Sequence, residues 1–194
     1  MAPILGIYAS QISGHLWAPS GAYESIATTT VGAGGASSIT FSSIPSTYTH
    51  LQIRFIARDN RGLSYSYLGL RFNGDTGANY RNHYLVGYGS SVGAGSDGGG
   101  LTRWPTDGIP GGSATANVFG AGIIDILDYT STTNNKTLRA LVGNDTNGGG
   151  SIYFDSGLWY ATPSAITSIT IVDQSNGEGN FVQYSQFALY GIKG

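Results

Sequence analysis

Residues 48–58 carry the sequence YTHLQIRFIAR, and the alternation within this stretch decides the fold class. Successive side chains of a β-strand point to opposite faces, so every second residue shares a face. The apolar members of one face are Leu51, Ile53, Phe55 and Ala57. Gln52, Arg54 and Arg58 fall on the other face. The stretch therefore predicts a strand with one side in a hydrophobic core and the other side toward solvent.

The same period of two recurs from residue 22 to the end of the chain. Besides 48–58, the main predicted strands are 38–42, 67–73, 80–88, 118–127, 137–142, 152–160, 166–172 and 181–192. No stretch of the chain shows a sustained helical period, and Gly, Ser, Thr and Tyr are abundant. We expect an all-β protein of about nine or ten strands. About eight principal strands, in two facing sheets of about four, make a jelly-roll β-sandwich of two antiparallel sheets.

Glycine and asparagine mark several turns between these strands. Residues 73–75 (Asn-Gly-Asp), 147–150 (Asn-Gly-Gly-Gly) and 175–177 (Ser-Asn-Gly) each follow a predicted strand. Tight hairpins need residues that tolerate positive φ, and Asn and Gly do so most readily. Each of the three segments therefore predicts a hairpin.

One predicted connection, residues 89–112, is much longer than the others. Structureless loops of more than about 15 residues are uncommon unless they are functional or disordered. Arg103, Trp104 and Pro105 lie in the middle of this segment. A tryptophan in such a loop favours burial against something, so we expect these three residues to form a contact loop that faces a neighbouring subunit or a receptor.

Composition and charge exclude several classes of protein. Charged residues make up 10% of the chain, the formal net charge is −2, and the nine Lys and Arg residues form no run. Nucleic-acid binding needs a basic patch, so we expect no nucleic-acid partner. No apolar stretch reaches 18 residues, so we expect no membrane span, and residues 1–20 lack the basic start of a secretory signal. The chain has no Cys, which excludes disulfides and thiolate metal sites.

Residues 1–21 differ from the rest because they are apolar without a clear period. An exposed segment of this kind tends to bind another surface. We interpret residues 1–21 as an extended N-terminal docking arm and residues 22–194 as a single sandwich domain; the alternative is that the arm forms the first strand of the domain. The anchoring side chains would be Ile4, Leu5, Ile7, Tyr8, Leu16 and Trp17.

Motifs of the common catalytic sites are missing from the sequence. It contains no G-x-x-x-x-G-K and no H-E-x-x-H, and His15, His50 and His83 lack metal-ligand spacing. Asp75-Thr76-Gly77 matches the triplet of aspartic proteases, but its position after a predicted strand favours a turn. Residues 144–148 resemble a calcium loop without its distal Glu. We therefore predict that the protein is not an enzyme and uses no cofactor or metal.

Several segments together resemble a family of virion proteins of tailed bacteriophages. They are GAYESIATTTVGAGGASSITFSSIPSTYTHLQIR (residues 21–54), LRFNGDTGANY (70–80) and FALYGIKG (187–194), preceded by the arm APILGIYAS (2–10). The resemblance extends from about residue 3 to residue 192, and the segment 89–112 contributes least to it. It implies a jelly-roll structural component on the head or tail of the particle, without catalytic residues.

These observations lead to one main hypothesis and two alternatives. The main hypothesis is a capsid decoration protein on the virion exterior, bound to the major capsid protein through its arm and forming a homotrimer. The first alternative is a tail-fibre or baseplate appendage bound to tail proteins of the same virion. The second is a module that binds host surface glycans through an aromatic platform. The platform candidates are Tyr84, Tyr88, Trp104, Trp159 and Tyr160.

Overall fold

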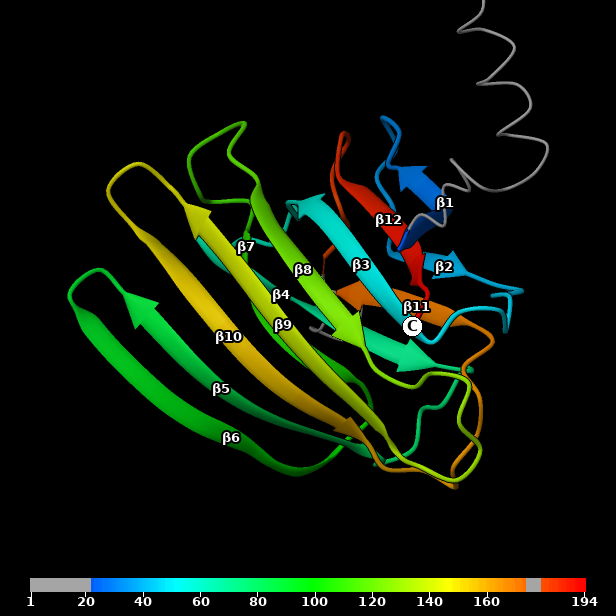
Figure 1. The fold of residues 1–194 in the computed structure, drawn as a ribbon. Coiled ribbons are helices and arrows are strands. Elements are labelled where there is room, and N and C mark those ends of the chain that lie inside the picture. The colour runs from blue at the N-terminus through cyan, green and yellow to red at the C-terminus, as the bar shows by residue number, and fades with distance from the viewer. Residues whose placement is uncertain (1–21, 174–178) are drawn as a thin grey trace, which may run out of the picture.

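The computed structural model describes residues 22–173 and 179–194, which form a β-sandwich of two antiparallel sheets (Figure 1). The strands are β1 (Tyr23–Thr30), β2 (Ser38–Phe41), β3 (His50–Ala57), β4 (Tyr65–Phe72), β5 (Tyr80–Tyr88), β6 (Ser91–Leu101), β7 (Trp104–Pro110), β8 (Gly120–Ile126), β9 (Lys136–Asp145), β10 (Gly150–Trp159), β11 (Ile169–Asp173) and β12 (Gln186–Ile192). The predicted arm, residues 1–21, and the predicted turn at 175–177 lie outside the described residues.

The two sheets differ in size. The larger has eight strands in the order β1-β12-β3-β8-β9-β10-β5-β6, and the smaller has four in the order β2-β11-β4-β7. The antiparallel sandwich predicted from the sequence is confirmed. The expected division into two four-stranded sheets is wrong, because the larger sheet contains eight of the strands and the smaller sheet contains four.

The prediction of one long connection over residues 89–112 is also wrong. Most of the segment forms β6, which pairs with β5, and β7, which pairs with β4. The sequence of β6, SVGAGSDGGGL, has too few apolar side chains to show a period of two. The sequence of β7, WPTDGIP, contains two prolines, which strands tolerate at a sheet edge. Both strands are edge strands, so neither depends on the alternation that identified the central strands.

The hydrophobic core lies between the sheets, and β3 lies within it as predicted. Leu51, Ile53, Phe55 and Ala57 are all buried, and Phe55 stacks on Phe187 of β12 at a centroid distance of 5.9 Å. A second aromatic group joins the sheets where Phe72 of the smaller sheet meets Tyr80 and Trp159 of the larger. The core cluster extends under β12, β3, β8 and β9 of the larger sheet and includes Tyr80 of β5 and Trp159 of β10.

Two predicted turns have different outcomes. Residues 145–150 form the expected hairpin: β9 and β10 pair directly, with positive φ at Asn147 and Gly148. Asn73 and Gly74 also have positive φ, at 52° and 71°. However, this turn joins β4 of the smaller sheet to β5 of the larger, so it is a crossover between sheets and not a hairpin. Local turn chemistry was predicted correctly, but strand pairing was not.

Replacing Phe55 with Ala is expected to lower the free energy of unfolding by about 3–5 kcal/mol, because the lost ring leaves a cavity against Phe187. Urea denaturation of the purified protein measures this change. The matched control is Leu63→Ala, since Leu63 is 41% exposed in a loop; its cost should stay below about 1 kcal/mol. Equal effects of the two substitutions would contradict the central position of β3.

Candidate functional site

The outer face of the eight-stranded sheet carries two rows of apolar side chains. The register between neighbouring strands aligns one row as Ile123, Leu141, Phe154, Leu85 and Ala94. The adjacent row consists of Ile56, Ala121, Gly143, Ile152, Gly87 and Val92. Together these eleven positions, called here the apolar face, extend over β3, β8, β9, β10, β5 and β6. None of them carries a charge.

The apolar face is unusually exposed for its size. Its large side chains expose between 40% (Ile123) and 79% (Val92) of their surfaces. The strand registers place these side chains next to one another on a single face of the sheet. Large contiguous apolar patches on a soluble protein mark interaction sites. The apolar face therefore has the character of a contact surface.

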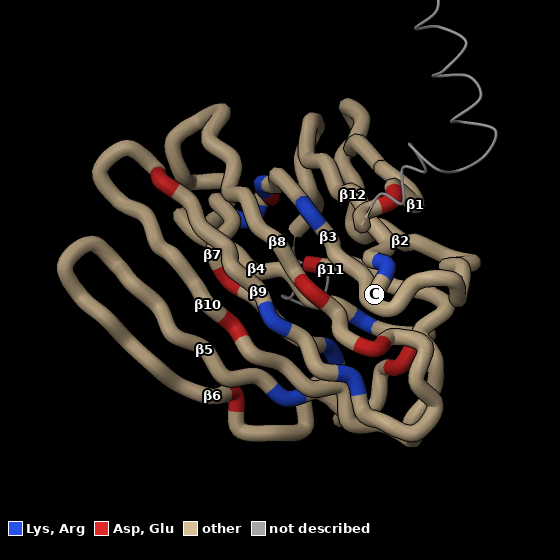
Figure 2. The backbone as a smooth tube through the Cα atoms, in the orientation of Figure 1, with Lys and Arg blue, Asp and Glu red and all other residues tan. Residues whose placement is uncertain are grey.

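The next row along the same face is polar and gives the apolar face a sharp border. Register aligns Gln52, Asp125, Arg139, Ser156, His83 and Ser96 across the strands. Gln52 Nε2 donates to Asp125 Oδ1 over 2.8 Å, and Arg139 Nε donates to Asp125 Oδ2 over 2.8 Å. Figure 2 shows the charged positions of β8 and β9 side by side on this sheet. An apolar centre next to a polar margin is the usual anatomy of a protein interface.

The apolar face is not flat, because small residues leave a hollow within it. Ala121, Gly122 and Gly143 form its floor, and Leu141 and Ile152 stand at its side. The volume of this shallow hollow is about 480 Å³. Nearly all atoms that line it are apolar, so it suits an aliphatic or aromatic side chain better than a polar ligand.

The outer face of the four-stranded sheet is different. Thr40 on β2 and Thr170 on β11 share a hydrogen bond of 3.2 Å between their hydroxyls. The Arg103 side chain lies over Gly69 of β4, where a Cβ would be 2.4 Å from Arg103 Cδ. Arg71 Nε donates to the Thr102 carbonyl. This face is polar and cationic, so the two outer faces of the sandwich have opposite characters.

A buried polar network lies between the sheets where β7 meets β5 and β10. Asp155 Oδ2 accepts a hydrogen bond from Thr106 Oγ1 at 2.7 Å, and Asp155 Oδ1 accepts one from Asn82 Nδ2 at 3.3 Å. Burial raises the pKa of Asp155 to about 6 despite these donors. Burial, together with the charges of Asp155 and Asp97, raises the pKa of Asp107 to about 7. The network thus holds carboxyl groups that bind protons more readily in the folded state than in the unfolded chain.

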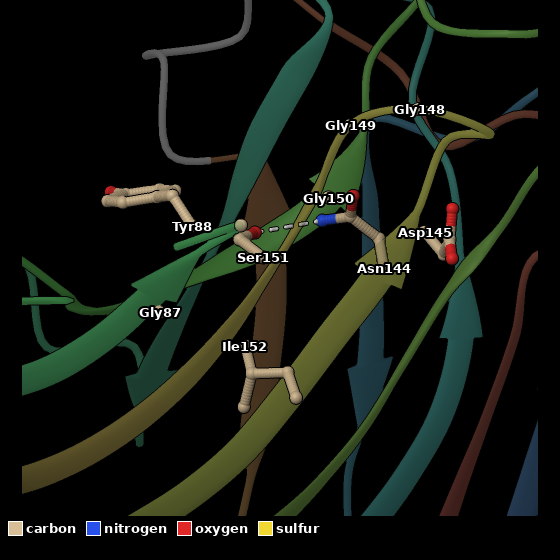
Figure 3. Close-up of a pocket in the computed structure, with 10 residues that line it drawn as sticks. Gly87, Tyr88, Asn144, Asp145, Gly148, Gly149, Gly150, Ser151 and Ile152 are labelled. Carbon is tan, nitrogen blue, oxygen red and sulfur yellow. Dashed lines mark hydrogen bonds between the residues drawn. The ribbon is translucent and has the colours of Figure 1, made fainter. Parts of the chain in front are cut away.

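A second cleft lies between the tips of the β5–β6 and β9–β10 hairpins and has a volume of about 700 Å³ (Figure 3). Figure 3 shows the Tyr88 ring on the opposite side of this cleft from Asn144 and Asp145. Asn144 Nδ2 donates to Ser151 Oγ at 3.2 Å, and Asp145 Oδ1 accepts from the Asn147 amide at 2.8 Å. Because these polar groups serve the hairpin itself, the cleft has no convergent set of groups aimed at a ligand.

The predicted contact loop requires a correction. Trp104 is fully buried in β7 and donates through Nε1 to Asn82 Oδ1 at 3.0 Å; Pro105 is also buried. Neither side chain is available to a partner on the surface. The reason is that the segment is an edge strand of the smaller sheet, so the tryptophan that suggested an external contact makes an internal one. Arg103 lies just before β7, over Gly69.

The predicted aromatic platform does not come together either. Trp104 and Trp159 are buried in the core, whereas Tyr88 and Tyr160 are 48% and 58% exposed. Tyr84 lies on β5 beside Tyr153, at a centroid distance of 6.4 Å. With both tryptophans inside the sandwich, the proposed stacking surface is absent from the described residues.

The triplet Asp75-Thr76-Gly77 forms a turn, as predicted. Asp75 Oδ1 accepts hydrogen bonds from the Gly77 amide and Asn79 Nδ2, and Asp75 Oδ2 accepts one from Trp159 Nε1 at 2.7 Å. Burial acts to raise the pKa of Asp75, but these donors outweigh it and lower the pKa. The carboxylate therefore orders the crossover between the sheets.

The six predicted anchoring residues of the arm lie outside the described residues. Within residues 22–173 and 179–194, no three His, Asp or Glu side chains are grouped as a metal ion would require. The same part of the chain contains no helix with the length and hydropathy of a membrane span. Comparisons with protein-family models, with curated proteins and with solved structures find no match to this chain.

The apolar face was not predicted from the sequence, although the sequence contains a signal for it. The strands that form it contain runs in which neighbouring residues are both apolar, such as Ile123-Ile124, Ala140-Leu141-Val142 and Ile152-Tyr153-Phe154. In a strand, adjacent apolar residues place apolar surface on both faces. Such runs predict that both faces of the sheet are covered.

Replacing Gly157 with Ala is expected to destabilise the fold by about 1–3 kcal/mol or more, because its Cβ would lie 1.9 Å from Trp104 Nε1. The matched control is Gly87→Ala on the neighbouring strand, where nothing lies within 4 Å of the new Cβ. Thermal unfolding followed by circular dichroism compares the two variants. A neutral Gly157→Ala would contradict the packing of β7 beneath β10.

The buried carboxyl groups predict that stability falls as the pH rises. In the folded state the pKa values of Asp155 and Asp107 are about 6 and about 7, above their unfolded values of about 4. Between these limits the folded state binds more protons, so the free energy of unfolding declines from about pH 4 to about pH 7. Urea denaturation at pH 5 and pH 8 should show the lower stability at pH 8. Asp107→Asn should reduce this difference, and an unchanged difference would contradict the assignment.

Proposed function

We propose that this protein is a non-enzymatic structural component of a tailed-bacteriophage virion, and specifically a capsid decoration protein on the particle exterior. In this proposal residues 1–21 attach the β-sandwich to the major capsid protein. The resemblance of residues 21–54, 70–80 and 187–194 to virion proteins supports the viral setting.

The observation that carries the proposal is the apolar face. Leu141, Ile152 and Phe154 each expose more than half of a large apolar side chain. Soluble monomers seldom leave so much contiguous apolar surface in water, because covering it is favourable by about 25 cal/mol per Å². Particles made of many subunits provide such cover by contacts between proteins. The face therefore supports an assembly role over the role of a free enzyme or carrier.

The arm supplies the second part of the proposal. Ile4, Leu5, Ile7, Tyr8, Leu16 and Trp17 give it several large apolar side chains. Each of them stabilises a contact by about 1.5–3 kcal/mol when fully buried. Linking several subunits multiplies such weak contacts through a high effective concentration. An assembled set of sandwiches would thus bind a capsid tightly through short arms.

The proposal predicts that the full chain co-sediments with purified tailless capsids, whereas a chain lacking residues 1–17 does not. Trp17→Ala should weaken binding because it removes the largest anchor of the arm, and Gln11→Ala is the matched control that should not. Circular dichroism checks that the shortened chain is folded. Failure of the full chain to bind capsids would reject the decoration role and favour the tail or a host-surface glycan.

A further inference from the structure

We propose that the apolar face is covered by the same face of a second copy of this chain, so that two eight-stranded sheets pack face to face about a two-fold axis. This inference rests on the proposed function, since it names the occupant of the contact surface on which that function depends.

The area of the apolar face fits this occupant. Each partner of a standard stable interface contributes about 800 Å². Seven adjacent large apolar side chains, which expose 40–79% of their surfaces, supply a substantial part of such an area. Sheets that pack face to face interdigitate their side chains at a separation of about 10 Å. A regular sheet surface with rows of Leu, Ile and Phe matches this mode of packing.

The apolar face combines a shallow hollow with projecting side chains. Ala121 and Gly143 form a hollow in one part of the face, and Ile152 and Phe154 project from β10 beside it, exposing 62% and 51% of their surfaces. A two-fold axis pairs each patch with its own copy, so a ridge and a hollow on one subunit meet a hollow and a ridge on the other. The β10 ridge of each copy would thus enter the hollow of its partner.

The charges also permit self-association. The eleven positions of the apolar face hold no ionisable group. Its border holds exposed Arg54, which pairs in register with Ile123, and Asp125 and Arg139, which form an ion pair 2.8 Å apart. Such a border presents both signs, so a second copy meets no block of like charge. The whole chain has a formal net charge of −2, which adds little long-range repulsion.

The test measures the mass of the purified full chain by sedimentation equilibrium over a wide range of concentrations. The expected result is a dimer. Leu141→Lys and Ile152→Lys each place a charge inside the buried face and should weaken the dimer at least about 30-fold. The matched control is Tyr160→Lys, because Tyr160 is 58% exposed but lies outside the apolar face; it should leave the mass unchanged. All three positions are exposed, so the variants should keep the wild-type circular dichroism spectrum.

A second readout uses the absence of cysteine from the chain. The single thiol of Ala121→Cys lies in the hollow and should react with a maleimide at least about tenfold more slowly in the dimer than in the Leu141→Lys background. Equal rates in both backgrounds would overturn the proposal.

The remaining outcomes separate the other occupants of the face. A monomer at all concentrations would overturn the proposal, as would a dimer that Leu141→Lys and Ile152→Lys leave intact. A mass of three subunits, the homotrimer expected from the sequence, would also overturn it, because a trimer joins two different surfaces. Loss of the dimer on removal of residues 1–17 would assign the contact to the arm. Capsid binding is measured separately, so a dimer that fails to bind capsids rejects the proposed function and keeps this inference.

Discussion

The indole of Trp104 occupies the space left by Gly157, and the arrangement of the two sheets depends on this contact. Trp104 begins β7, the edge strand of the smaller sheet, while Gly157 on β10 and its register partner Asn82 on β5 belong to the larger sheet. The indole packs against Gly157, and its Nε1 donates a hydrogen bond to Asn82 Oδ1. Since every atom of the Trp104 side chain is buried, a shift of β7 would expose the ring or force it into the β10 backbone. The contact therefore fixes where the smaller sheet ends beneath the larger one.

The larger sheet continues beyond β7 to the edge strand β6. There its inner face consists mainly of glycine and tyrosine residues. On β6 the positions that face inward include Gly93 and Gly95, and the Tyr84 ring lies over Gly95, where a Cβ would be 2.6 Å from the tyrosine hydroxyl. Tyr88 and Tyr153 meet edge to face and share a hydrogen bond between their hydroxyls. Tyrosine suits this overhang because its ring covers the sheet while its hydroxyl reaches a polar partner. Tyr84 and Tyr88, which the sequence analysis assigned to a glycan platform, thus pack with Tyr153 on the inner face of this part of the sheet.

The sequence predicts the central strands well because each of them buries apolar side chains in the core on at least one face. Alternation at Leu51, Ile53 and Phe55 identified β3, and Asn147-Gly148 identified the β9–β10 hairpin. The edge strands β6 and β7 were not predicted, because their glycines and prolines give no period of two. The pairing of strands was not predicted either, because it depends on contacts between residues far apart in the chain. The crossover at Asn73 shows the same limit: its backbone conformation is local and was predicted, but the sheet to which the next strand belongs is not local. The apolar face was overlooked because its residues were interpreted as members of a one-sided pattern.

The unequal sheets connect folding to assembly. An eight-stranded sheet has two faces, and the four-stranded sheet covers only one of them. Runs such as Ala140-Leu141-Val142 give β9 apolar side chains on both faces, a composition otherwise found in sheets that are covered on both sides. Exposure of the apolar second face to water is unfavourable. Because this face exists only in the folded sheet, a partner that covers it binds the folded state and not the unfolded chain. Such binding raises stability with concentration, because mass action favours the state that carries the complete surface. The uncovered second face of the larger sheet is thus the feature of the sandwich on which the proposed association depends.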